Sequence, residues 1–102
     1  MTANSGMNFP SIYTITNTIS KKTYVGQTIN TRRRWHSHRW HLDKCEHRNS
    51  YLQRSWKKHG ADAFIFTVIV NLSAIPKNQL KEALDKAEIE VLAKFPKAFN
   101  LM

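Results

Sequence analysis

Two short β-rich segments separated by a polar turn constrain the fold of this chain most strongly. Residues 11–16 alternate between two faces, one beginning at Ile12 and the other at Tyr13. Residues 17–22 are polar and of the kinds that form turns, and residues 23–26 return to a β-rich composition. Because β-branched and aromatic residues favour strands and polar clusters favour turns, this pattern predicts an antiparallel hairpin.

Two basic helices are expected after the hairpin. Asn30 is a suitable N-cap for the first helix, and Asn49 or Ser50 for the second. Gly60 is well placed to end the second helix. Side chains recur at helical spacing in both segments: Arg34, Trp35, His38 and Leu42 in the first, and Leu52, Trp56 and His59 in the second.

One more strand and one more helix complete the expected fold. Residues 63–70 are dense in β-branched and aromatic residues, which is too apolar for an edge strand and indicates a central one. Residues 78–94 are rich in helix formers and carry an apolar stripe. The order β-β-α-α-β-α predicts an α+β fold, a three-stranded antiparallel-containing sheet flanked by helices. With 102 residues, we expect one domain over residues 11–102 and a flexible N-terminal arm over residues 1–10.

The net charge indicates a polyanionic partner. Lys and Arg number 16 and Asp and Glu number 7, which gives a formal charge of +9. Such a surface attracts polyanions, so nucleic acid is the first partner to consider and an anionic membrane the second. The plain alternative is a basic protein without a polyanionic partner.

Cysteine content and hydropathy restrict the setting. Cys45 is the only cysteine, so neither an intrachain disulfide nor a thiolate zinc cluster can form. The chain has no apolar run of the ~20 residues that a membrane span needs, and its N-terminus lacks the pattern of a signal peptide. We therefore expect no membrane association and a reducing, cytoplasmic setting.

Glu88 is the acidic residue whose position asks for an explanation. Leu84 lies four residues before it and Val91 three residues after it, so Glu88 projects from the apolar stripe of its helix. A carboxylate in such surroundings needs a cation, a metal ion or a proton. The alternatives are a residue at the edge of the stripe that reaches water, or a structural salt bridge.

The first helix carries cations around nearly its whole circumference, so some of them must point toward the core. An arginine fork can grip a scissile phosphate through two hydrogen bonds, although for any single arginine here a solvated face that follows the DNA backbone is the favoured role. His38 and His41 are spaced to converge, but without a third ligand the indication of zinc is weak, and a proton-transfer role for a histidine is favoured. The residues concerned are Arg32, Arg33, Arg34, His36, His38, Arg39 and His41.

The two tyrosines of the hairpin are candidates for proton transfer. A phenol has a pKa of about 10, so Tyr13 or Tyr24 can act as a base only where cations stabilise the phenolate. The arginine-rich helix can supply that field. Taken singly, each would be an ordinary half-buried strand aromatic. Gly26 ends its strand where the backbone either turns or lets a ligand approach closely.

Ser11-Ile12-Tyr13 and Tyr24-Val25-Gly26 together resemble the two tripeptides that name the GIY-YIG nuclease family. The resemblance extends from Ser11 to Asn100, and residues 52–60 are similar to the catalytic domains of phage and intron homing endonucleases. It implies a catalytic domain over residues 11–102 that cleaves double-stranded DNA with one divalent metal ion, Mg²⁺ or Mn²⁺. It also places the protein in the cytoplasm of a bacterial or phage-infected host cell.

The resemblance assigns roles by position. Tyr13 and Tyr24 match the two motif tyrosines, Arg34 matches a phosphate-stabilising arginine, and Glu88 matches the single metal-binding glutamate. His38 matches a histidine of the homing members, and the general base stays open among Tyr13, Tyr24 and His38. Contacts to the nucleic acid are expected from Arg32, Arg33, Arg39, His47, Lys57, Lys58 and Asn100.

Some residues depart from the family pattern. Ser11 replaces a glycine and Val25 an isoleucine, and Gln27 stands where the repair branch has lysine. Homing endonucleases of this type usually continue into a separate DNA-binding domain, so the chain is expected to be either a catalytic domain that works with such a domain or partner, or a minimal nuclease. The alternative function is a non-catalytic basic module that binds nucleic acid.

Overall fold

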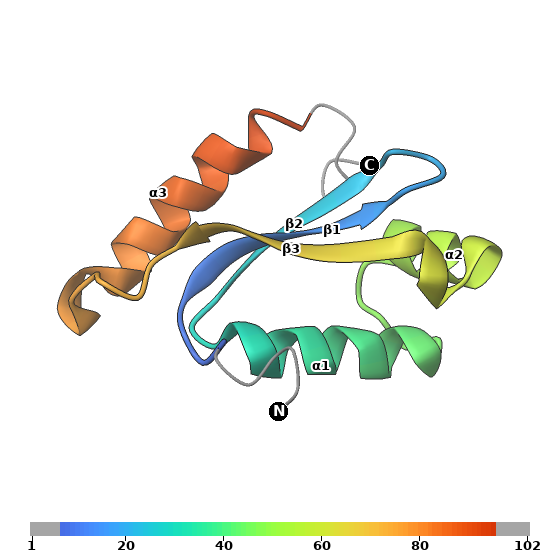
Figure 1. The fold of residues 1–102 in the computed structure, drawn as a ribbon, viewed down its shortest axis with the longest axis horizontal. Helices are drawn as coiled ribbons and strands as arrows, with labels where there is room; N and C mark the ends of the chain where they lie inside the picture. Colours follow the sequence, from blue (N-terminus) through green and yellow to red (C-terminus); the bar gives the residue numbers. More distant parts are fainter. Residues whose placement is uncertain (1–6, 96–102) are drawn as a thin grey trace.

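The structure, a computed structural model, describes residues 7–95. A strand hairpin, β1 (Ser11–Asn17) and β2 (Thr23–Thr28), is followed by helices α1 (Thr31–Asp43) and α2 (Ser50–His59). Strand β3 (Phe64–Asn71) and helix α3 (Leu80–Leu92) complete the fold, with short 3₁₀ turns before each of them at Ala61–Ala63 and Lys77–Gln79. Figure 1 shows α1 on one side of the sheet and α3 on the opposite side. The expected α+β fold and the order β-β-α-α-β-α are confirmed.

The strand order corrects one expectation. The three strands are antiparallel in the order β2-β1-β3, so β1 is central and β3 lies at an edge. The apolar composition of β3 indicated a central strand, which is wrong. Its side chains alternate between core and surface, and Ile65 and Ile69 are 53% and 44% exposed. The strand buried on both faces is β1, whose residues from Ser11 to Ile15 are all buried.

Each face of the sheet has its own apolar core. On one face Tyr13 and Ile15 of β1 pack against side chains of α1, α2 and β3, and on the other Ile12 and Val25 pack against α3 and the segment before it. Removing this area from water is the main stabilising contribution to the fold. The first core contains Tyr13, Ile15, Trp35, Leu42, Leu52, Trp56, Ala63 and Phe64, and the second Ile12, Val25, Leu72, Leu84 and Val91.

The helix boundaries follow the expected capping residues. The Asn30 side chain accepts a hydrogen bond from Arg33 N at 3.0 Å, and Asn49 accepts from the backbone of the first turn of α2 at 3.0 Å. Gly60 ends α2 with a φ of 83°, a conformation that glycine adopts without strain. Helix α3 is shorter than the expected range of residues 78–94, because its first turn is a separate 3₁₀ turn.

Hydrogen bonds tie the segment before β1 to the rest of the domain. Thr31 N and Leu72 N donate to the carbonyl oxygens of Phe9 and Pro10 at 3.1 and 2.9 Å. The hydroxyls of Ser11 and Thr31 also lie 2.6 Å apart, which joins the start of β1 to the start of α1. None of the helices in residues 7–95 is long and apolar enough to cross a membrane.

Candidate active site at the edge of strand β2

The candidate site lies beside the free edge of β2, where helices from both faces of the sheet reach the same strand. Gly26 of β2 lies opposite Tyr13 of β1. A methyl group on Gly26 would overlap the Tyr13 hydroxyl. The motif glycine is therefore needed so that the phenol can lie across the backbone of the neighbouring strand.

Tyr13 is the first member of a hydrogen-bonded series of buried and partly buried side chains. Its Oη lies 2.5 Å from His38 Nε2, and His38 Nδ1 lies 2.7 Å from His47 Nε2. The planes of the two imidazoles differ by 23°, and their ring centroids lie 4.9 Å apart. Tyr13 is wholly buried and His38 is 2% exposed, so α1 holds this histidine against the sheet and away from solvent.

Tyr24 and Arg34 lie where this buried series meets the surface. The Tyr24 ring packs edge-on against His38 and His47, with centroids 5.3 and 6.1 Å away. The adjoining cavity measures about 460 Å³, and its lining includes Tyr24, Arg34 and both histidines. Its other lining residues are Ser37, His41, Arg48 and Asn49. The cavity thus offers an anion a phenol, imidazoles and two guanidinium groups from one side.

Burial and the charge of Arg34 set the protonation of these groups. Burial raises the pKa of both Tyr13 and Tyr24, while the charge and hydrogen bond of Arg34 act in the opposite direction. Burial followed by the Arg34 charge lowers the pKa of His38 to about 3 and that of His47 to about 4. Both tyrosines are therefore phenols and both histidines neutral imidazoles near pH 7.

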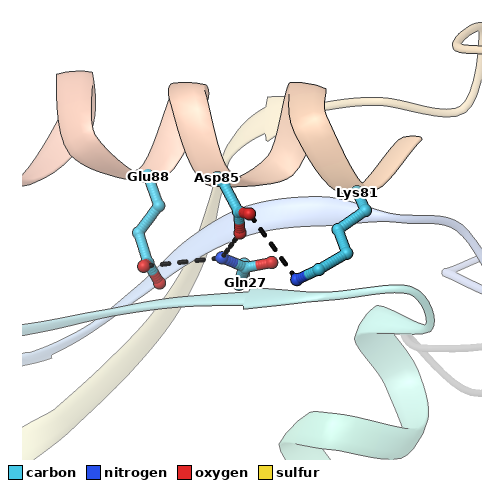
Figure 2. Close-up of polar contacts among 4 residues, drawn as sticks. All are labelled: Gln27, Lys81, Asp85 and Glu88. Atoms are coloured by element: carbon cyan, nitrogen blue, oxygen red, sulfur yellow. Dashed lines mark hydrogen bonds and ion pairs between the residues drawn. The ribbon is translucent and has the colours of Figure 1, made fainter. Parts of the chain in front are cut away.

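Glu88 reaches the same strand edge from the other face of the sheet. It is partly buried on α3, and its charge adds to the rise in the pKa of both tyrosines. Figure 2 shows Glu88 and Asp85 directed at Gln27 of β2, whose Nε2 donates to Asp85 Oδ1 at 3.0 Å and approaches Glu88 Oε2 at 3.5 Å. The hydrogen bond from Gln27 lowers the pKa of Asp85, which also pairs with Lys81 at 3.5 Å.

The chemistry of this carboxylate fits a hard divalent cation. Within residues 7–95 no lysine or arginine pairs with Glu88, so the expected alternative of a structural salt bridge is not found there. Among the described residues, the one polar contact of Glu88 is the long hydrogen bond from Gln27 Nε2. A partly buried carboxylate without a cationic partner suits Mg²⁺, which takes few protein oxygen ligands and keeps several waters. No group of three or more His, Cys, Asp or Glu residues in the described chain is arranged for a metal, and His41 instead lies 2.7 Å from Ser37 O.

The structure separates the expected nucleic-acid contacts into two groups. His47 lines the cavity and belongs to the buried series. Five basic residues, Arg32, Arg33, Arg39, Lys57 and Lys58, are exposed on α1 and α2 outside the cavity lining. The Arg39 guanidinium covers the Phe66 ring at 4.2 Å. Asn100 lies outside the described residues.

Several residues of the site were not identified from the sequence. In the sequence, Gln27 stands out only as the position where the repair branch of the family has lysine. Asp85 does not stand out, although it lies three residues before Glu88 and so on the same helical face. Arg48 and Asn49 lie in the turn between α1 and α2, and no periodicity predicts that this turn lines the cavity, although Asn49 was expected as a helix cap. The spacing of His38 and His41 suggested convergence, but the partner of His38 is His47.

Comparison of this chain with known protein families identifies its family. The model of the GIY-YIG catalytic domain matches residues 9–95, which includes every element that builds the site. The chain belongs to the GIY-YIG family. Endonucleases of this family are generally dependent on a divalent metal ion.

Relatives of this GIY-YIG domain come from homing endonucleases. Intron-associated endonuclease 1 of Enterobacteria phage T4 is 45% identical over 49 residues, which are 48% of this chain and 20% of the phage protein. The chain thus spans only about a fifth of that relative.

Two solved structures support the fold. The catalytic domain of the homing endonuclease I-TevI superposes with a TM-score of 0.67 at 29% identity, covering 87% of this chain and 96% of that one. A glutamate-to-alanine variant of the same catalytic domain gives a TM-score of 0.70 at 30% identity, covering 91% and 93%.

Proposed function

We propose that this chain is a divalent-metal-dependent DNA endonuclease whose active site is the β2 edge. The observation that carries the proposal is the convergence of Tyr13, Tyr24 and Arg34 at one strand edge with Glu88, which has no cationic partner within residues 7–95. A catalytic domain of the family supplies the reaction class, and the net charge of +9 suits a polyanionic substrate.

Each residue has a task in phosphodiester hydrolysis. The cavity admits the scissile phosphate, and the Arg34 guanidinium donates to its oxygens as negative charge builds up in the transition state. Glu88 would hold Mg²⁺ or Mn²⁺, which when bound supplies positive charge for the phosphate and for the leaving 3′-oxygen. The products would carry 5′-phosphate and 3′-hydroxyl ends.

The two tyrosines take part in removing a proton from the attacking water. Both phenols are protonated at rest, so one of them must lose its own proton to the surroundings before it can accept another. The Arg34 charge favours that loss for both. Tyr24 lines the cavity, whereas Tyr13 is buried behind it. We therefore assign contact with the phosphate and the attacking water to Tyr24. Tyr13 would stabilise the negative charge that remains when one of the two tyrosines is ionised.

Matched substitutions test the proposal. Glu88→Gln and Arg34→Ala should each abolish cleavage of supercoiled plasmid and leave the circular dichroism spectrum and thermal midpoint nearly unchanged. Glu90→Gln and Arg54→Ala change exposed residues outside the site, so they should cleave as the wild type does. Cleavage by Glu88→Gln at the wild-type rate would remove Glu88 from the site. A plasmid mobility shift without cleavage by the wild-type protein would favour a binding module instead.

The site residues account for cleavage of DNA of any sequence. Their contacts are to phosphate, which carries no sequence information directly. Selection of a target site would then come from a further DNA-binding domain or partner.

A further inference from the structure

His38 and His47 belong to a hydrogen-bonded series whose direction is set by one backbone amide. Asn49 N donates to His47 Nδ1 at 3.1 Å. A backbone amide can only donate, so His47 Nδ1 must be the acceptor and carries no proton. This contact starts the series that ends at Tyr13.

The remaining proton positions follow one after another. A neutral His47 without a proton on Nδ1 carries it on Nε2, and that N–H donates to His38 Nδ1 at 2.7 Å. His38 must then carry its own proton on Nε2, where it donates to Tyr13 Oη at 2.5 Å. The low pKa values of both histidines keep them neutral. The groups that face His38 are Arg34 and His41 from α1, His47 from the turn, and the two tyrosines from the sheet.

This direction decides between two chemical roles. His38 has no unprotonated ring nitrogen free to accept a proton, because Nε2 carries hydrogen and Nδ1 accepts from His47. It cannot serve as the general base in this arrangement. It instead presents an N–H to the phenol oxygen of Tyr13, which stabilises a phenolate more than a phenol.

One side chain holds the turn from which His47 enters the series. Gln53 Oε1 accepts from His47 N at 2.9 Å, and Gln53 Nε2 donates to Leu42 O at 3.0 Å. The amide therefore joins α2, the turn and the end of α1. Asn49 is fixed in turn as the N-cap of α2.

We propose that Gln53 is a positioning residue, which holds His47 and the Asn49 amide so that His38 is locked as an N–H donor to Tyr13. The catalytic consequence rests on the proposed nuclease function, whereas the locked tautomers do not. Loss of Gln53 should free the His47 backbone and let both imidazoles sample the other tautomer.

Long-range ¹H–¹⁵N spectra of the imidazoles, recorded without metal or DNA, test the tautomers directly. In the wild type, both His38 and His47 should be protonated on Nε2 alone at neutral pH. Gln53→Ala should show signals of the Nδ1-protonated form, and the matched control Gln79→Ala, on the exposed 3₁₀ turn before α3, should not. An Nδ1-protonated wild-type histidine would overturn the series, and unchanged tautomers in Gln53→Ala would overturn the role of Gln53.

A second variant covers the case in which Gln53→Ala does not fold. Gln53→Glu keeps an acceptor for His47 N but loses the donor to Leu42 O. It should fold and retain the wild-type tautomers, and an Nδ1-protonated form in this variant would show that the bond to His47 does not set them.

Kinetics give the catalytic readout. In Gln53→Ala, kcat should fall about 10- to 100-fold because the phenol loses an aligned donor, while KM stays within about 2-fold since no phosphate contact is removed. Altered tautomers with an unchanged kcat would refute the catalytic consequence. If the wild type shows the expected tautomers but cleaves no DNA with metal present, the proposed function fails and the hydrogen-bonded series stands.

Discussion

Replacing Gly26 with alanine tests how tightly the sheet holds Tyr13. The added methyl group would overlap the Tyr13 hydroxyl and lie 2.5 Å from Cζ and 3.0 Å from Cε1 of the ring. Atoms of a folded protein do not approach this closely, so the ring or the strand must move. Tyr13 is wholly buried on the central strand and cannot turn into solvent.

The magnitude follows from two costs. Overpacking a filled core costs about 1–3 kcal/mol, and a buried hydrogen bond weakened by displacement costs a similar amount. We expect the free energy of unfolding of Gly26→Ala to fall by about 2–6 kcal/mol. The cleavage rate of the folded protein should fall about 100-fold, since small displacements of reacting groups have effects of this size.

Gly60→Ala is the matched control. Gly60 has a φ of 83°, and apart from its chain neighbours no atom of residues 7–95 lies within 4 Å of the position of its missing Cβ. Its ψ of 160° places it in a backbone region that is essentially restricted to glycine, so an alanine there should cost about 1–3 kcal/mol through backbone strain and leave the site intact. Urea unfolding measures both stabilities, and plasmid cleavage at a temperature where both variants are folded measures the rates. A Gly26→Ala protein as stable as the wild type, or equal rate losses in both variants, would refute the reasoning.

Three further predictions concern stability. Because burial holds the folded-state pKa of His38 near 3 and of His47 near 4, below the 6.5 of the unfolded chain, the unfolded state binds more protons in that window. The contribution of these two histidines to the free energy of unfolding is therefore fully present above about pH 6.5, and it decreases on acidification by at most about 1.4 kcal/mol per pH unit for each histidine. Urea titrations at several pH values measure this decrease, and a flat profile would contradict it. Ser11→Gly, which restores the family tripeptide, should lower the free energy of unfolding by about 1–2 kcal/mol because it removes the buried 2.6 Å bond to Thr31, and no loss in chemical denaturation would disprove that contribution. Lys81→Ala breaks an exposed pair of 3.5 Å and should leave the thermal midpoint nearly unchanged, because solvent screens such a pair; a clear fall in the midpoint would contradict this.

Local features of this fold could be predicted from the sequence because they depend on neighbouring residues. Asn30, Asn49 and Gly60 mark helix ends through contacts within one turn, and the structure confirms all three. The placing of β3 could not be predicted in the same way. An apolar run such as residues 64–70 has the same composition whether its strand lies in the centre or at an edge of the sheet. The position of β3 is decided instead by its pairing with β1 on one edge and by the packing of one of its faces.

The candidate site likewise contains residues that the local pattern predicts and contacts that it does not. Glu88 could be singled out because an acid on an apolar stripe violates the local pattern, and the structure shows it partly buried without a paired lysine or arginine in the described residues. The contact between His38 and His47 spans nine residues and a turn that is held by Gln53. Helical spacing says nothing about such a turn, so periodicity favoured His41 as the neighbour of His38.

Cleavage of supercoiled plasmid by the wild-type protein in Mg²⁺ and in EDTA tests the central claim most directly. Nicked or linear DNA in Mg²⁺, none in EDTA, and none with Glu88→Gln in Mg²⁺ is the predicted result. Cleavage that persists in EDTA would contradict the metal dependence. Binding of the plasmid without cleavage, with Mg²⁺ and Mn²⁺ each supplied, would contradict the assignment of a catalytic site to the β2 edge.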